Sequence, residues 1–183
     1  MKSLKIILLT AIVVLASCGT SRTVPITGRK QNLIVSDEQL LSLSTQQYSE
    51  YMKTAKKSSN TKNTAMVQRV GKNIATAVEK YLKDNGMANE LSGYKWEFNL
   101  VQDKSVNAFC MPGGKIVVYE GLLPVTQTET ALAIVVGHEV AHAVAKHSAE
   151  QMSKQYKQQI GLEIGSSVLS AVGMDQNTSS LVD

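Results

Sequence analysis

The chain has 183 residues, of which 43% are hydrophobic, and a formal net charge of +4. This length suits one domain with a sizeable core, and we find no internal repeat in the sequence. Its 19 basic and 15 acidic residues form no patch that indicates nucleic-acid binding, so we expect no nucleic-acid partner. Two cysteines are present, Cys18 and Cys110.

The N-terminus has the pattern of a secretory signal peptide. Two lysines precede an apolar run from residue 6 to residue 16, which is too short for a typical membrane span. Residues 15–18, Leu-Ala-Ser-Cys, resemble a bacterial lipobox, so we expect residues 1–17 to be removed and Cys18 to carry a lipid. The alternative is an ordinary cysteine after a signal peptide of another class. The lipobox predicts a protein of the bacterial cell envelope that is lipid-anchored, faces the periplasm and is held at the outer membrane.

Residues 18–35 contain few large apolar side chains, and they are predicted to be a lipidated tether and a leading loop. Cys110 is then the remaining thiol, so the mature chain can form no intramolecular disulfide. No neighbouring residue in the sequence would activate this thiol. We therefore expect Cys110 to be a small, partly buried residue without a catalytic role.

Two amphipathic helices are predicted next. Ser36 and Gln39 form a capping box, and apolar residues recur at helical spacing to about residue 55. The lysine-rich stretch 53–63 is expected to be a solvated loop, with a membrane-surface patch as the alternative. The same spacing predicts a second helix over residues 64–84.

A small sheet is predicted between these helices and the rest of the chain. Large apolar residues alternate with polar ones from residue 94 to residue 100, which is the period of a half-buried strand. Two further strands, 106–110 and 115–119, flank a Met-Pro-Gly-Gly turn. With the helix that follows, this order predicts an α+β fold, mainly helical, with a small antiparallel sheet beside the last helix.

That last helix contains the motif His-Glu-x-x-His. Thr126 and Glu129 form a capping box, and the run that follows is apolar nearly all round, which predicts a buried helix. Residues four apart share a helix face, so His138 and His142 can bind one metal ion, with Glu139 beside it. The pattern is typical of a zinc peptidase site in which the glutamate is the general base. The alternative is a helix with two solvated histidines.

Two neighbours of the motif carry expectations of their own. Gly137 lies in mid-helix, where glycine is unfavourable by roughly 1 kcal/mol, so we expect it to admit a neighbouring backbone. His147 follows His142 by five residues, about 140° further round a continuous helix. It is therefore expected to make a structural hydrogen bond near the site or to be exposed, and not to bind the metal.

Four segments resemble one family in their order and residues. They are Pro25–Arg29, Val106–Phe109 with the following Pro112–Gly114, Gly121–Leu123, and His138–Glu150. Together they resemble the gluzincin-type zinc metalloendopeptidases, which include periplasmic quality-control lipoproteases and, more distantly, CAAX prenyl endopeptidases. The resemblance implies a zincin-like domain in which His138 and His142 bind Zn²⁺ and Glu139 is the base.

The resemblance also implies where a substrate binds. The strand after the double glycine, residues Lys115, Ile116, Val117 and Val118, is expected to be a free edge along which an extended polypeptide can lie. An unpaired edge offers backbone donors and acceptors at regular spacing, which is the physical reason for this expectation.

The third zinc ligand of that family is a Glu on a later helix, and it has no counterpart before the end of this chain. Glu163 would lie about 31 Å from His142 along a continuous helix, far beyond ligand distance. Glu150 is likewise not expected to be the third ligand. We therefore expect residues 36–183 to be the N-terminal part of a metallopeptidase domain, and the chain to be a truncated form of a longer protease.

Two functions remain open from the sequence. The first is a zinc metalloendopeptidase that is bound to a membrane through its lipid and cleaves unfolded or misassembled envelope proteins. The second is a catalytically incomplete lipoprotein that binds unfolded polypeptides through the edge strand, because loss of a ligand weakens a zinc site.

Overall fold

The computed structural model describes residues 20–171, and the burial of side chains from 21 to 167. The predicted signal peptide and the predicted lipidation site Cys18 lie outside the described residues. The elements in order are β1 (Thr20–Thr23), β2 (Lys30–Leu33), α2 (Asp37–Thr54), α3 (Thr61–Asp84), a 3₁₀ helix (Ala88–Leu91), β3 (Glu97–Val101), β4 (Ala108–Met111), β5 (Lys115–Tyr119), a second 3₁₀ helix (Glu120–Leu122), α4 (Leu123–Thr126), α5 (Glu129–Val144) and α6 (His147–Ala171).

The two predicted N-terminal helices are present as α2 and α3. Ser36 caps α2, and its side chain and that of Gln39 form the predicted capping box. Asn60 caps α3, whose first residue is three positions before the predicted start, because the asparagine oxygen accepts a hydrogen bond from the backbone of Asn63. The predicted solvated loop is thereby shortened to residues 55–60.

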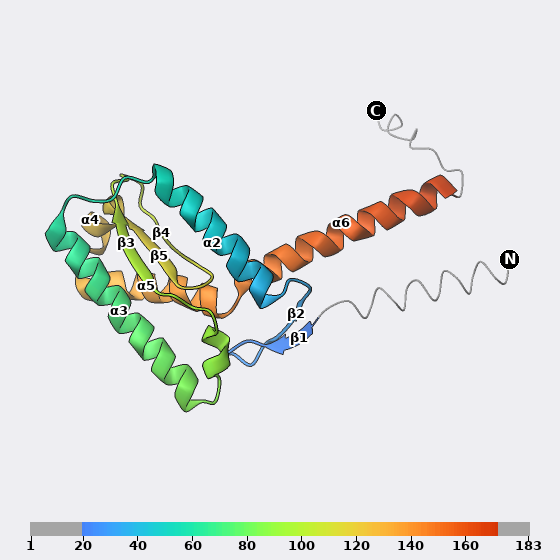
Figure 1. The fold of residues 1–183 in the computed structure, drawn as a ribbon, viewed down its shortest axis with the longest axis horizontal. Helices are drawn as coiled ribbons and strands as arrows, with labels where there is room; N and C mark the ends of the chain where they lie inside the picture. The colour runs from blue at the N-terminus through green and yellow to red at the C-terminus, as the bar shows by residue number, and fades with distance from the viewer. Residues whose placement is uncertain (1–19, 172–183) are drawn as a thin grey trace.

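The central sheet has three strands in the order β3-β5-β4 (Figure 1). The hairpin of β4 and β5 is antiparallel, as predicted, but β3 runs parallel to β5, so the sheet is mixed and not purely antiparallel. The α+β fold class is confirmed. Two parallel strands need a crossover connection, and here the chain between β3 and β5 includes β4. Residues 102–107 connect β3 to β4, which lies on the other side of β5.

The prediction that β5 is a free edge is therefore wrong. Lys115, Ile116, Val117 and Val118 lie in the middle strand, each paired on both sides and at most 7% exposed. A run of apolar side chains buried on both faces is typical of a central strand. Among the described residues, β4 pairs with a strand on one side alone, so β4 is the edge beside the motif helix.

Helices cover both faces of this sheet. Ile116 and Val118 point to one face, where they join the core that α3 and α5 build, and Val117 points to the other face, against α2. Helix α3 approaches β3 closely at Gly71, where an added Cβ would lie 2.3 Å from a ring carbon of Phe98. Helix α6 leaves this body and projects away from it (Figure 1).

The segment predicted to be a tether and loop contains an antiparallel hairpin, β1 and β2. Its second strand packs against α6, where Leu33 and Ala149 are both buried. The sequence pattern missed this hairpin because its two strands are short and carry few apolar residues, and because Leu33 is buried by α6, which is distant in the sequence. Within residues 20–171 no helix is both long and apolar enough to cross a membrane.

Candidate metal centre

Helix α5 fixes the position of the motif. Thr128 is its N-cap, accepting a hydrogen bond from the backbone of Ala131 at 3.1 Å, so the cap lies two residues after the one predicted at Thr126. Leu132 and Val140 are fully buried against the sheet. The helix is not buried all round, however, because Ile134 is 70% exposed and His138 is exposed. Its apolar face is anchored in the core, which leaves another face free for the histidines.

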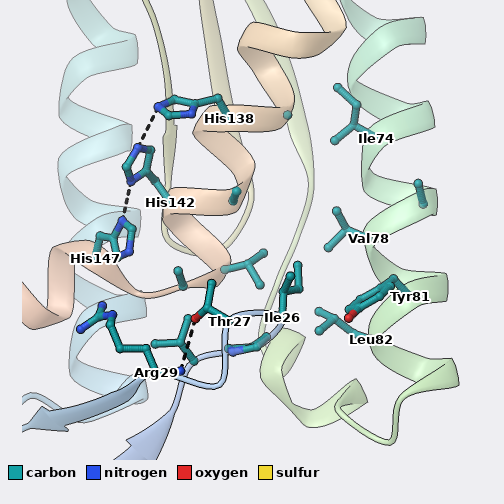
Figure 2. Close-up of a pocket in the computed structure, with 17 residues that line it drawn as sticks. Ile26, Thr27, Arg29, Ile74, Val78, Tyr81, Leu82, His138, His142 and His147 are labelled. Carbon is teal, nitrogen blue, oxygen red and sulfur yellow. Dashed lines mark hydrogen bonds between the residues drawn. The ribbon is translucent and has the colours of Figure 1, made fainter.

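The two motif histidines converge. The Nε2 atoms of His138 and His142 are 2.9 Å apart, and the ring planes are nearly perpendicular (Figure 2). Zinc–nitrogen bonds of about 2.05 Å in a tetrahedral site need a nitrogen separation of about 3.3 Å, so a small ring rotation would admit the ion. These two side chains therefore fit a metal ion.

The third motif residue, Glu139, is half-buried on α5, which packs against β4. Burial raises the pKa of Cys110 on that strand to about 12, with a smaller contribution from the negative charge of Glu139. The thiol thus stays protonated at neutral pH, as expected of a residue without a nucleophilic role. Glu139 is therefore close to Cys110 on β4.

A pocket of about 610 Å³ opens beside the histidines (Figure 2). Apolar side chains of α3, including Ile74 and Val78, form one wall, and the turn between β1 and β2 forms another. Gly137 lines the pocket, and an added Cβ there would meet nothing within 4 Å. The expectation that Gly137 admits a neighbouring backbone is therefore wrong; the position faces open space.

A third protein ligand is absent from residues 20–171, where no group of three His, Cys, Asp or Glu side chains could hold a metal ion. Glu163 lies on α6, which is continuous from His147, and this places it about 24 Å along the helix from the start of α6. Glu150 is engaged elsewhere, by Arg29. These positions agree with the expectation that neither Glu163 nor Glu150 is a zinc ligand.

His147 lies beside His142 and not on a separate helix face. Helix α5 ends at Val144, and Lys146 has a positive φ of 55°, so the chain turns before α6 begins. The Nδ1 atoms of His142 and His147 are 2.5 Å apart. Burial, helped by the nearby positive charges, lowers the pKa of His147, which favours the neutral ring at pH 7. Of the two expectations for this residue, the hydrogen bond near the site is the one observed.

The β1–β2 hairpin is fastened to the start of α6. Arg29 donates to both carboxylate oxygens of Glu150, at 2.9 and 2.6 Å, and Gln31 donates to Glu150 and to the backbone oxygen of Ala145. Sequence reasoning noted Arg29 within a family-like segment but gave it no role. A bidentate partner for Arg29 could not be inferred from a position 121 residues away.

Replacing Glu150 with Gln should lower stability at pH 7. The hydrogen bonds from Arg29 hold the pKa of Glu150 down to about 2, so the carboxylate stabilises the fold fully above its unfolded pKa of about 4.3. That contribution is lost as the pH falls from there toward 2. We expect the urea midpoint of the variant to lie below that of the wild type at pH 7 and the gap to narrow at pH 3. A gap that is constant with pH would contradict this assignment.

Comparison with known proteins identifies the family. The model of peptidase family M48 matches residues 61–182, which include α3, the sheet and the His-Glu-x-x-His motif. The chain is similar to mitochondrial metalloendopeptidases OMA1: 46% identical over 67 residues in Arabidopsis thaliana, 42% over 64 in Schizosaccharomyces pombe and 32% over 117 in Homo sapiens. These alignments cover 37%, 35% and 64% of this chain but 14%, 19% and 22% of the relatives. The chain thus spans less than a quarter of the length of each of these relatives.

Two expectations change with these relatives. They are named mitochondrial in several species, so the predicted location at a bacterial outer membrane, facing the periplasm, is contradicted. The lipobox reading rested on four residues, whereas the relatives match the folded domain. The predicted resemblance to a zincin-like metallopeptidase family is confirmed, although these relatives are not periplasmic lipoproteases. On the match over residues 61–182, this chain belongs to peptidase family M48.

Proposed function

We propose that this chain carries the core of a zinc-dependent metalloendopeptidase that cleaves unfolded polypeptides. The observation that supports it best is the convergence of His138 and His142, whose Nε2 atoms are 2.9 Å apart at the mouth of an open pocket. Membership of a peptidase family supports the reaction class. The names of the OMA1 relatives, metalloendopeptidases, support cleavage within a chain.

The residues of α5 divide the chemistry between them. His138 and His142 would hold the ion, which supplies a Lewis acid that polarises the scissile carbonyl and acidifies the attacking water. Glu139 accepts the proton of that water and passes it to the leaving amine. A carboxylate can both accept a proton and give it up, as these two proton transfers require. Glu139 also lies beside the histidines on the same helix, close to the edge strand where a peptide can bind.

An extended substrate fits along β4. This strand borders a cavity of about 500 Å³ through Phe109, and α2 and α6 line the same cavity through Leu40 and Met152. A polypeptide that adds to the free edge forms backbone hydrogen bonds whatever its sequence. Unfolded chains meet that requirement because their backbone groups are available. Glu139 lies near this strand, so a bound peptide would pass the proposed base.

A second function is favoured by one observation. Among residues 20–171, His138 and His142 converge through their Nε2 atoms, but no group of three side chains is placed to hold a metal ion. Without a bound ion, the cavity beside β4 would still bind extended chains, and the protein would hold polypeptides without cleaving them.

Measurement of the zinc content distinguishes the peptidase function from the binding function. Purified chain should contain about one zinc per molecule, and His138→Ala should lower its zinc affinity by about 100-fold or more, since even outer partners of ligands contribute 10–100-fold. Ile134→Ala, an exposed change on the same helix, is the matched control and should bind zinc like the wild type. Wild-type protein free of zinc after dialysis against a zinc buffer would reject the peptidase and leave the binding function.

The proposal includes attachment to a membrane through a lipid on Cys18, which the lipobox-like residues 15–18 support. Cys18→Ser should then move the chain from the membrane fraction to the soluble fraction. An unchanged distribution between the two fractions would remove this part of the proposal.

A further inference from the structure

A break in the helix between His142 and His147 brings the two rings together. On a continuous helix these residues would lie about 140° apart. Instead α5 ends, Lys146 adopts a left-handed conformation, and His147 begins α6 with its ring against that of His142 (Figure 2). The ring centroids are 4.7 Å apart and the planes meet at 64°. The contact follows from the break in the helix.

The three rings form a chain with defined hydrogen-bonding roles. The Nε2 atom of His142 faces His138, and its Nδ1 atom faces His147. An imidazole nitrogen that binds a metal ion has no proton, so the neutral ring carries its proton on the other nitrogen. His142 must then donate from Nδ1, and the acceptor in place is Nδ1 of His147. This arrangement requires His147 to carry its own proton on Nε2.

The position of His147 is fixed by the residues on either side of it. Lys146 is 6% exposed. Its Nζ atom forms ion pairs with the carboxylates of Asp37, at 2.6 Å, and Glu90, at 3.5 Å. A left-handed residue that is not glycine is unfavourable and persists where the surroundings determine it. On the other side, three residues after His147, Glu150 forms an ion pair with Arg29.

We propose that His147 is a positioning residue, which accepts a hydrogen bond from Nδ1 of His142 and thereby aims Nε2 of His142 at the ion. The inference rests on the proposed function in so far as that ion is zinc. Metal-binding histidines commonly donate their second ring N–H to a fixed partner, which sets both the tautomer and the ring orientation. Here the partner is a third histidine, held by the helix break.

The first test measures zinc affinity in three variants. His147→Leu removes the acceptor and should weaken zinc binding by about 10–100-fold. His147→Asn can place an amide oxygen near the position of Nδ1 and should restore affinity to within about threefold of the wild type. Ser148→Ala, at the exposed neighbouring position, is the control. Urea midpoints show whether each variant is folded.

Ring-nitrogen NMR spectra provide a second readout that does not depend on activity. In the zinc-loaded wild type, His142 should be protonated on Nδ1 and His147 on Nε2, and His147→Leu should mix the tautomers of His142. Equal zinc affinities in a folded His147→Leu variant and the wild type, or His142 protonated on Nε2, would overturn the positioning role. A wild type that binds no zinc contradicts the proposed function instead, and the metal-free spectra then decide whether His142 still donates to His147.

Discussion

Glu139→Gln will abolish peptide hydrolysis by the zinc-loaded protein while leaving its metal content unchanged. Glutamine has nearly the size of glutamate, so His138 and His142 keep their positions, but the amide cannot accept the proton of the attacking water. Loss of a general base costs about 10²- to 10⁴-fold in rate, and we expect a loss of about a thousandfold. The measurement is the initial rate of cleavage of an unfolded polypeptide such as casein, beside zinc quantified by mass spectrometry.

The matched control is Glu163→Gln, which makes the same chemical change at an exposed carboxylate on α6. Its rate and zinc content should equal those of the wild type. Equal cleavage by the Glu139 variant and the wild type would show that another group takes the proton or that a contaminating protease is at work. Loss of zinc together with loss of activity would make Glu139 a residue that supports the metal site, and would remove its role as the base.

Leu132→Ala will destabilise the fold by about 3 kcal/mol. Leu132 is fully buried on α5, in the core shared with α3 and the sheet, and truncation of such a leucine typically costs 2–5 kcal/mol through lost burial and the cavity left behind. Domains have a total stability of about 5–15 kcal/mol, so this is a large fraction of it. Urea unfolding followed by circular dichroism measures the change.

Ile134→Ala is the control for this change, since Ile134 lies two residues further along the same helix and is 70% exposed. Surface substitutions usually change stability by less than about 0.5 kcal/mol. A similar loss in both variants would mean that Ile134 is covered in solution, and that the exposed face of α5 packs against something. A small loss in Leu132→Ala would mean that α5 is not anchored in the core as described.

The motif and the helices were determined by local sequence. His-Glu-x-x-His places two imidazoles on one face because an α-helix has 3.6 residues per turn, and this holds wherever the helix packs. Ser36 and Gln39 marked the start of α2 because a capping box satisfies backbone groups within four residues. The Met-Pro-Gly-Gly turn likewise predicted the β4–β5 hairpin, since turn geometry depends on the residues in the turn.

The tertiary structure decided the features that join distant segments. The apolar run along β5 indicates a buried strand but cannot say whether that strand lies at the edge or in the middle of the sheet. That choice depends on whether β3 pairs with β4 or with β5, and a parallel pairing with β5 leaves no mark in local sequence. The free edge beside the motif helix is consequently β4, and the predicted substrate edge moved with it.

The tertiary structure also decided which residues surround the candidate metal site. Helical spacing alone placed His147 away from His142, because it assumed a helix that continues past Ala145. The break there is maintained by ion pairs from Lys146 to Asp37 and from Glu150 to Arg29, whose partners lie more than a hundred residues earlier. Local spacing determines which side chains share a helix face, but where a helix ends against other elements depends on contacts that form only when the whole chain is folded.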